Sequence, residues 1–148
     1  MNNNLSKSCK ITVVAAAATA ATTAVTSDVL DMQGYDGVMF IALTGDVTAS
    51  SVLTLTVKGN TANSTSSPTP ITQKATAAVT AGATDSDSKA LVVDVHKPPL
   101  RYAFAVLTRA DQNAVVGGII AIQYCAGLKP TTHDATVIAS AFGVGVSS

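Results

Sequence analysis

Apolar and polar residues alternate with a period of two along several short stretches of the chain. Residues 52–58, VLTLTVK, alternate Leu and Val with Thr and Lys, and residues 91–96, LVVDVH, place Leu91, Val93 and Val95 on one face. A period of two is typical of a β-strand that presents one face to a core and the other to solvent. Val, Ile and Thr also suit a pleated sheet, because their branched side chains are stiff at χ1. The pattern therefore predicts an all-β protein.

Two further stretches are apolar at consecutive positions. Residues 38–43 read VMFIAL, and residues 115–122 read VVGGIIAI. Strands of this kind are buried on both faces, between their sheet neighbours and another layer or another subunit. We expect them to be the central strands of the protein.

About eight strands are expected, each bounded by turn-forming residues. They are Lys10–Val14, Ala24–Met32, Val38–Thr44, Val52–Lys58, Ile71–Val79, Ala90–His96, Arg101–Thr108 and Val115–Tyr124. Alanines in Ala15–Ala24 favour a helix, but Thr and Val interrupt them and no N-cap or Gly stop brackets the segment. The polar run 109–113 is short enough to close a hairpin. The pattern predicts a single-domain antiparallel β-sandwich with a jelly-roll-like topology.

Three regions are expected along the chain: an extended N-terminal arm over residues 1–27, a sandwich core over 28–128 and a C-terminal arm over 129–148. Both arms consist of polar or small residues, which gain order by docking on something else. The stretch 59–70 has two prolines and is expected to be a projecting loop. Residues 11–25 resemble a weak secretory signal, but threonines dilute the apolar region, so a β-rich arm is favoured.

The composition limits the partners of the chain. Of its 148 residues 12% are charged, and nine Lys and Arg balance nine Asp and Glu. This charged fraction is about half that of typical soluble domains, and a net charge of zero favours association. We therefore expect neighbouring subunits to cover much of the outer surface, although Ser, Thr and Asn could instead replace charges on a solvated surface. Scattered basic residues predict no nucleic-acid partner, and the lack of an apolar run of about 18 residues predicts no membrane partner.

The residues that could carry chemistry form no catalytic or cofactor motif. There is no GxSxG element, and no Gly-rich segment opens a phosphate-binding helix. A metal site would need the fold to bring together Asp94, His96, His133 and Asp134. We therefore expect no enzymatic activity, no cofactor and no metal. Cys9 and Cys125 lack metal-binding spacing, so free thiols are favoured, while a disulfide between them stays open.

Two blocks of the chain carry distinctive motifs. The first, DVLDMQGYDGVMFIALTG, runs from Asp28 to Gly45, and the second, KPPLRYAFAVLTRADQNAVVGGIIAIQYCAGLKPTTHDAT, runs from Lys97 to Thr136. Their most specific parts are GYDGVMF, a PxxRY element at Pro98–Tyr102, TRADQNAVV, and AIQY followed by KPTTHD. Together they resemble a family of small proteins encoded among the head genes of tailed bacteriophages. The ending FGVGVSS departs from the more polar ending of that family, which leaves the C-terminal contacts open.

The resemblance implies a capsid cement or decoration subunit on the outer surface of the phage head. Such a protein is made in the host cytoplasm, binds the major capsid protein and its own copies as a homodimer or homotrimer, and stabilises contacts between capsid subunits without catalysis. Another structural phage protein, such as a head fibre base, a head–tail adaptor or a tail component, is an alternative. A carbohydrate-binding β-sandwich is a further one, although the chain has no Trp and only three Tyr and three Phe.

Contacts with the capsid and with neighbouring subunits are expected mainly in the two arms. Added strands or apolar strips are expected at Ile11, Val13, Val14, Thr131, Thr132, His133, Val137 and Ile138. Arg101 and Arg109 flank an apolar strand. They could form charge-assisted bonds with capsid carboxylates or with Asp28, Asp31 and Asp36. Internal ion pairs that fix loop ends are an equal alternative for both arginines.

Overall fold

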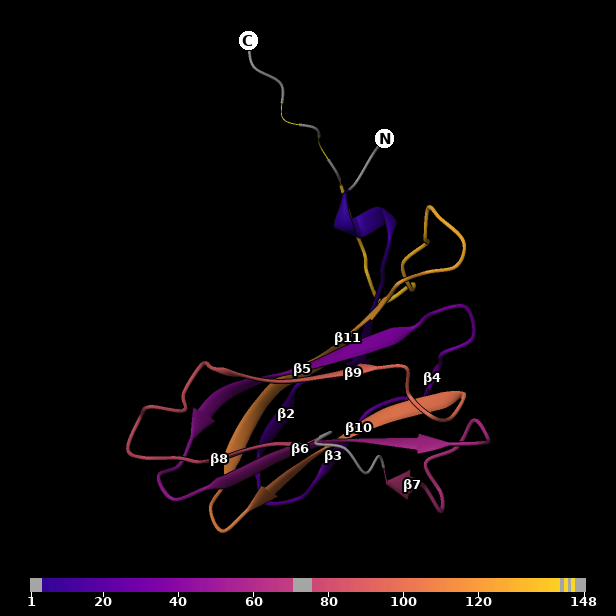
Figure 1. The fold of residues 1–148 in the computed structure, drawn as a ribbon. Helices are drawn as coiled ribbons and strands as arrows, with labels where there is room; N and C mark the ends of the chain where they lie inside the picture. Colours follow the sequence, from indigo (N-terminus) through magenta and orange to yellow (C-terminus); the bar gives the residue numbers. More distant parts are fainter. Residues whose placement is uncertain (1–3, 71–75, 142, 144, 146–148) are drawn as a thin grey trace.

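Two antiparallel β-sheets pack together in the computed structural model, which describes residues 4–70, 76–141, 143 and 145 (Figure 1). Sheet A has five strands: β1 (Lys10–Ala15), β2 (Ala18–Ala21), β5 (Gly37–Val47), β9 (Ala90–His96) and β11 (Ala114–Tyr124). Sheet B has six: β3 (Val25–Thr26), β4 (Leu30–Asp31), β6 (Val52–Asn60), β7 (Thr69–Pro70), β8 (Thr76–Thr80) and β10 (Tyr102–Ala110). A short 3-10 helix, η1 (Leu5–Lys7), precedes β1. No helix in the described part of the chain is long and apolar enough to span a membrane.

The strand order confirms the predicted β-sandwich. Sheet A has the order β1-β11-β5-β9 with β2 also paired to β11, so the two strands of apolar sequence, β5 and β11, are central as expected. Sheet B has the order β3-β10-β6-β7, with β4 on β10 and β8 on β6. If β1 with β2, β3 with β4, and β7 with β8 each count as one interrupted strand, eight units remain, ordered 1-8-3-6 and 2-7-4-5. The jelly-roll topology stays a prediction, which this order favours.

The expected strands correspond to observed strands, with two additions. Ala24–Met32 is divided into β3 and β4, and the described part of Ile71–Val79 belongs to β8, while residues 71–75 lie outside the described residues. The first addition is β2, which lies in the alanine-rich segment and forms neither a helix nor a loop. The second is the two-residue β7, at the end of the expected loop 59–70. Pairing with a long neighbouring strand thus overrides the weak propensity of these short segments.

The hairpin expected at residues 109–113 is wrong. β10 ends at Ala110 in sheet B and β11 begins at Ala114 in sheet A, so the turn carries the chain across the sandwich. Arg109 is consequently a strand residue whose side chain is buried. A short polar run suits a hairpin or a crossing equally well, and only the pairing partners of the two strands distinguish them.

The core lies between the sheets at the alternating positions that the sequence pattern predicts. Every second residue is buried from Leu53 to Val57 in β6 and from Leu91 to Val95 in β9. The core cluster consists mainly of Val, Leu, Ile and Ala together with Phe40. Small aliphatic side chains bury little apolar area each, so stability depends on many of them packing closely.

Most of residues 1–27 belong to the sandwich and do not form an extended arm. β1 and β2 pair with β11, and β3 pairs with β10. Cys9 and Val14 are each 1% exposed. The strand expected to be added to a neighbour pairs within the chain instead, because β11 offers a partner strand at much higher effective concentration than another molecule does, while Ile11 and Val13 still face outward.

The C-terminal segment lies along the outer edge of β1. The Ile11 N–H donates to His133 Nδ1 at 3.1 Å and the Val13 N–H donates to Thr136 Oγ1 at 2.9 Å. In the other direction, the Asp134 N–H donates to the Ile11 carbonyl oxygen at 3.2 Å. An uncovered edge strand is a template for pairing with other chains. Residues 131–136 therefore close one edge of sheet A.

Arg109 ties the two sheets together at one end of the sandwich. It is 4% exposed, and it lies on β10 of sheet B. Its guanidinium donates to the carbonyl oxygens of Thr19 and Thr23 at 2.7 Å and of Ala114 at 2.6 Å, and to the Thr23 hydroxyl at 3.2 Å. Bonds from a charged donor are stronger than neutral ones, so this side chain fixes β2 and the β2–β3 connection against the sandwich.

Replacing Arg109 by Met is expected to lower the free energy of unfolding by about 3 kcal/mol, because buried carbonyl oxygens lose their donors. Urea unfolding followed by circular dichroism measures the change. Arg101→Met, at an exposed position, is the matched control and should have a much smaller effect. Equal losses in the two variants would contradict the role assigned to Arg109.

Candidate interaction surface

The outward side of sheet A, called here the outer face, carries large apolar side chains on all four of its main strands. They are Ile11, Val13, Met39, Ile41, Leu43, Val92, Ile120 and Ile122. Val92 is 46% exposed, Leu43 39% and Val13 37%, and the others are partly exposed. Isolated exposed apolar residues are normal on a protein surface, whereas a contiguous group indicates an interaction site.

The strand register makes the outer face contiguous. One row across the sheet consists of Val13, Ile120, Ile41 and Val92. The neighbouring row consists of Ile11, Ile122, Met39 and Asp94. With strands about 4.8 Å apart and same-face residues about 6.8 Å apart, three rows across four strands cover roughly 400 Å², and the eight apolar side chains occupy about two thirds of these positions. Apolar patches of this size on a monomer are often functional.

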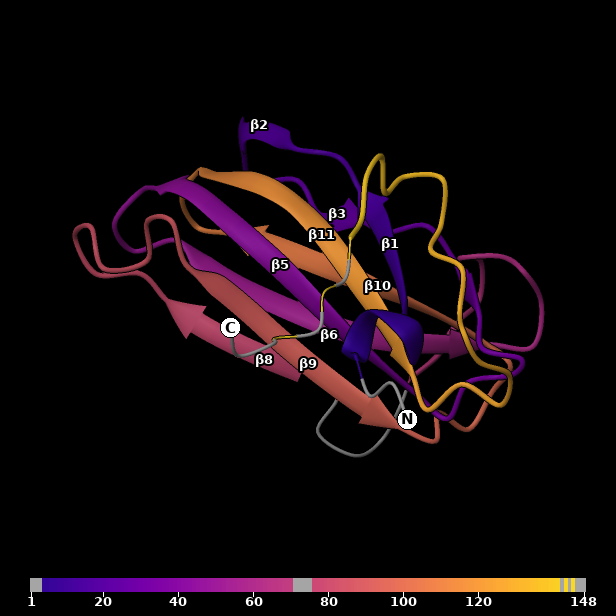
Figure 2. The same cartoon turned by 90° about the horizontal axis from the view of Figure 1, so that it is seen from above.

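The outward side of sheet B is more polar, although Val52 and Val106 also lie on it. Threonines follow one another across its strands, and they are Thr54, Thr56, Thr76, Thr80 and Thr108. Thr76 Oγ1 donates to Thr56 Oγ1 at 3.4 Å, and Lys58 is close by on β6. Figure 2 shows sheet A from above, with the strands of sheet B beneath it. The outer side of sheet B is therefore the more polar of the two.

A polar group closes one end of the outer face. The ring of Tyr124 crosses from β11 over Gly37 of β5, where a Cβ atom would lie 2.2 Å from the ring. The Tyr124 hydroxyl donates to Asp94 Oδ1 on β9 at 2.6 Å. The Tyr124 ring stacks on His96 of the same strand, with 6.2 Å between the ring centroids. Burial, reinforced by the bond to Asp94, raises the pKa of Tyr124 above its ordinary value, so the hydroxyl remains a donor at neutral pH.

The predicted contact residues of the two arms lie together, and many of them face each other. Val14 is 1% exposed and points into the core, so its expected contact with a partner is wrong. The Thr131 N–H donates to the Lys7 carbonyl oxygen at 3.0 Å, and Thr132, His133 and Val137 line a shallow depression against η1. Val13, Thr132 and Ile138 are exposed, whereas Ile11, Thr131, His133 and Val137 are partly exposed.

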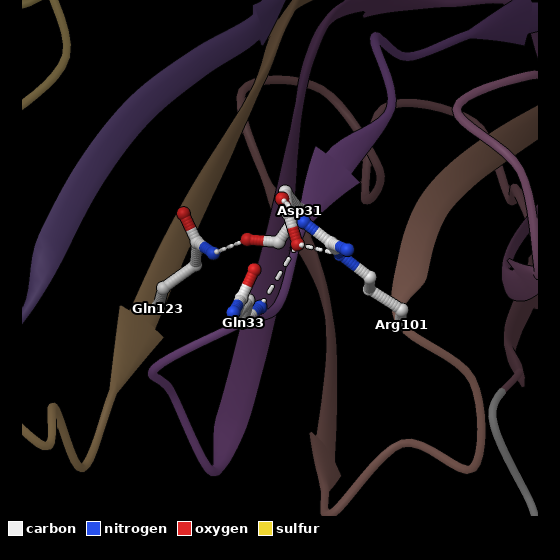
Figure 3. A network of polar contacts seen from close by, with 4 residues as sticks. All are labelled: Asp31, Gln33, Arg101 and Gln123. Atoms are coloured by element: carbon white, nitrogen blue, oxygen red, sulfur yellow. Dashed lines mark hydrogen bonds and ion pairs between the residues drawn. The ribbon is translucent and has the colours of Figure 1, made fainter.

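Arg101 binds one of its three expected carboxylates. Its Nε and Nη2 atoms donate to the Asp31 carboxylate at 3.0 and 2.8 Å, and the Gln33 N–H donates to the same group at 3.0 Å (Figure 3). Arg109 has only carbonyl and hydroxyl partners among the described residues, and its burial keeps it from a capsid carboxylate. The expected carboxylate contact is therefore wrong for Arg109.

Gln123 is a structural residue that sequence reasoning missed. It is 2% exposed on β11 of sheet A, and its Nε2 donates to the carbonyl oxygen of Asp31 in sheet B at 2.9 Å (Figure 3). The sequence did contain a signal for this role, which is a single polar residue at an inward-facing position of an otherwise apolar strand. It links the sheets at the end opposite to Arg109.

The four residues considered for a metal site are divided between opposite edges of sheet A. Asp94 and His96 lie on β9, while His133 and Asp134 lie beside β1, three strand spacings or about 14 Å away. Within the described ranges no three His, Cys, Asp or Glu residues are grouped as metal ligands would be. The two cysteines are free thiols, Cys125 exposed and Cys9 buried, and burial raises the pKa of the Cys9 thiol.

No protein-family model and no curated protein matches the chain. The resemblance to phage head proteins therefore stands on the quoted motifs alone. The fold itself defines a class: an antiparallel two-sheet β-sandwich whose two outer sides differ in polarity.

Replacing Asp31 by Asn is expected to reduce stability slightly at neutral pH and not at all in strong acid. The hydrogen bonds from Arg101 and from the Gln33 N–H hold the pKa of Asp31 below its usual value. A carboxyl with a lowered pKa stabilises the folded state above its unfolded pKa of about 3.9, and this contribution is lost as the pH falls through the folded value. Because the pair is exposed, the effect is small.

Urea unfolding of the wild type and of Asp31→Asn, at pH 7 and near pH 2, measures the difference between their free energies of unfolding. A difference that stays the same at both pH values would show that the charge of Asp31 is not its cause. Lys97→Gln, another charge removal on an exposed residue, serves as the control.

Proposed function

We propose that this protein is a capsid decoration or cement subunit, and that it lies with the outer face of sheet A on the outside of a phage head. The observation that carries the proposal is the contiguous apolar outer face in a chain with 12% charged residues and a net charge of zero. Apolar, charge-depleted centres with polar rims are typical of protein–protein interfaces. The group of Tyr124, Asp94 and His96 supplies such a rim.

The two-sided character of the sandwich supports this orientation. A subunit on the outside of a shell needs one side for the shell and another for water. The apolar side chains of sheet A suit the first, and the threonines and Lys58 of sheet B suit the second. Such a protein reinforces the shell by added contact area alone, which requires no catalytic group.

The size of the outer face fits a partner that presents many copies of the same site. A stable pairwise interface buries about 800 Å² on each partner, and the outer face supplies roughly half of that. A single contact of this size is weak by itself. On a capsid lattice, contacts from linked neighbouring subunits add, and avidity raises the overall affinity without new chemistry.

The resemblance in GYDGVMF and in AIQY followed by KPTTHD agrees with this proposal, because it points to the same class of protein. GYDGVMF leads into the central strand β5, and AIQY ends the central strand β11, so these motifs include outer-face residues such as Met39 and Ile122. Other structural roles in a phage particle would use the same face at lower copy number.

Mass spectrometry of purified particles from the phage that encodes this chain tests the proposed role. Hundreds of copies per particle are expected for a cement protein. A dozen copies or fewer would assign the protein to the neck or tail, and its absence from the particle would overturn the proposal.

Ile41→Lys is expected to lower binding to particles stripped of the protein by at least about tenfold, because it puts a charge at the centre of the outer face. Thr56→Lys makes the same charge change on the outward side of sheet B and should bind like the wild type. Co-sedimentation with stripped particles measures both variants, and circular dichroism checks their folding. Normal binding by Ile41→Lys would contradict the orientation proposed here.

A further inference from the structure

β9 is an edge of sheet A without a backbone partner on its outer side. Its seven residues pair with β5, and the described residues supply no further backbone hydrogen bond to positions 90–96. The opposite edge, β1, is covered by residues 131–136. The protein thus closes one edge of this sheet with its own chain and leaves the other available.

A mainly apolar cleft, with Asp85 and Lys89 also in its lining, adjoins the free edge. It has a volume of about 290 Å³ and lies where β9 of sheet A meets β8 of sheet B. Leu53, Ala77, Val79, Leu91 and Val92 are among its lining residues, and Val79 is 38% exposed. A strand added to β9 would find backbone partners along the edge and an apolar site for its inward side chains, which is the usual form of recognition by strand addition.

The end of the same chain has the chemistry of such a strand. Residues 137–148, VIASAFGVGVSS, are called here the tail segment, and they contain no charged side chain. Ile138 is 98% exposed, an unfavourable position for a large apolar residue. Residues 138–141 lead past η1 and away from both sheets (Figure 1). Asn4 Nδ2 donates to the Gly143 carbonyl oxygen at 3.0 Å, and Val137, Ser140 and Ala141 line the shallow depression against η1.

We propose that the tail segment of one copy pairs with β9 of a second copy as an added strand of sheet A, with apolar side chains in the cleft. The lengths agree, because nine residues from Val137 to Gly145 span roughly 30 Å and the seven residues of β9 roughly 23 Å at about 3.3 Å per residue. The acceptor is a second copy because residues 131–136 hold the base of the tail at β1, whereas β9 is the strand at the opposite edge of the sheet.

This contact joins different surfaces of the two copies, tail to edge. It therefore closes either as a reciprocal exchange in a dimer or as a ring, such as a trimer. Neither surface is the centre of the outer face, so the inference does not depend on capsid binding. The added strand would instead extend the outer face by one strand.

Two variants separate the donor from the acceptor in a sedimentation-velocity experiment. A chain that ends at Thr136 lacks the tail segment but keeps the bond from Val13 to Thr136. Val79→Lys keeps the tail and puts a charge into the cleft. Each variant alone is expected to be monomeric at concentrations where the wild type associates. An equimolar mixture should form dimers, because the first supplies a free edge and the second a tail.

Ile138→Asp is expected to weaken self-association at least about tenfold, since one large apolar side chain no longer enters the cleft. Leu128→Asp is the matched control, because it makes the same change at a residue that is 89% exposed outside the tail segment, and it should associate like the wild type. A monomeric wild type, association of the truncated chain alone, or a mixture that stays monomeric would each overturn the proposal. Association that survives in Ile41→Lys would show that this contact is independent of the outer face.

Discussion

The structure depends on one constraint, which is that successive side chains of a strand point to opposite sides of its sheet. β5 and β11 are apolar at nearly every position, so one set of side chains, such as Phe40, packs against sheet B, and the other, such as Ile41, must face outward. A shift of register by one residue would turn the outward side chains inward and the inward ones outward. Because both sets are apolar, hydrophobicity alone discriminates poorly between the two registers. Local fit fixes the register instead. Gly37 leaves room for the Tyr124 ring, and Gly118, with a φ of 126°, accommodates the irregularity in β11 opposite β1 and β5.

Polar contacts help to hold the short strands β2, β3 and β4, which contribute only Leu30 to the buried core. β2 consists of Ala and Thr, and β3 and β4 have two residues each. Such segments bury little apolar area, so hydrophobic packing contributes little to their position. Arg109 binds the backbone around β2 at one end of the sandwich, and Gln123 binds the Asp31 carbonyl of β4 at the other. A hydrogen bond to a backbone carbonyl oxygen does not depend on the side chain of the accepting residue. An alanine-rich segment can therefore occupy a defined place in a sheet.

The sequence predicts the elements of this fold better than their partners. Period-two patterns locate the long strands and the two central ones because burial acts on every residue of such a strand. The sheet to which β10 and β11 belong depends on contacts distant in sequence, so the run at 109–113 could not reveal a crossing. The outer face was present in the sequence as apolar strands expected to be covered by another layer or subunit, but its contiguity follows from register. The two arms were expected to bind other molecules, and their mutual contact at Ile11 and His133 spans residues too far apart for any local pattern.

The two proposed contacts act in different directions and so do not compete. Strand addition at β9 joins copies within the plane of sheet A, whereas the outer face acts along the normal to that plane. A chain with both contacts can form a layer whose members are linked sideways while each lies flat on a surface. Each contact by itself is small, and a low charge density removes the long-range repulsion that would oppose bringing many copies together. Linked weak contacts give strong attachment only where many equivalent sites repeat. A two-sided sandwich with one free edge is therefore suited to an extended shell and poorly suited to tight binding of a single soluble partner.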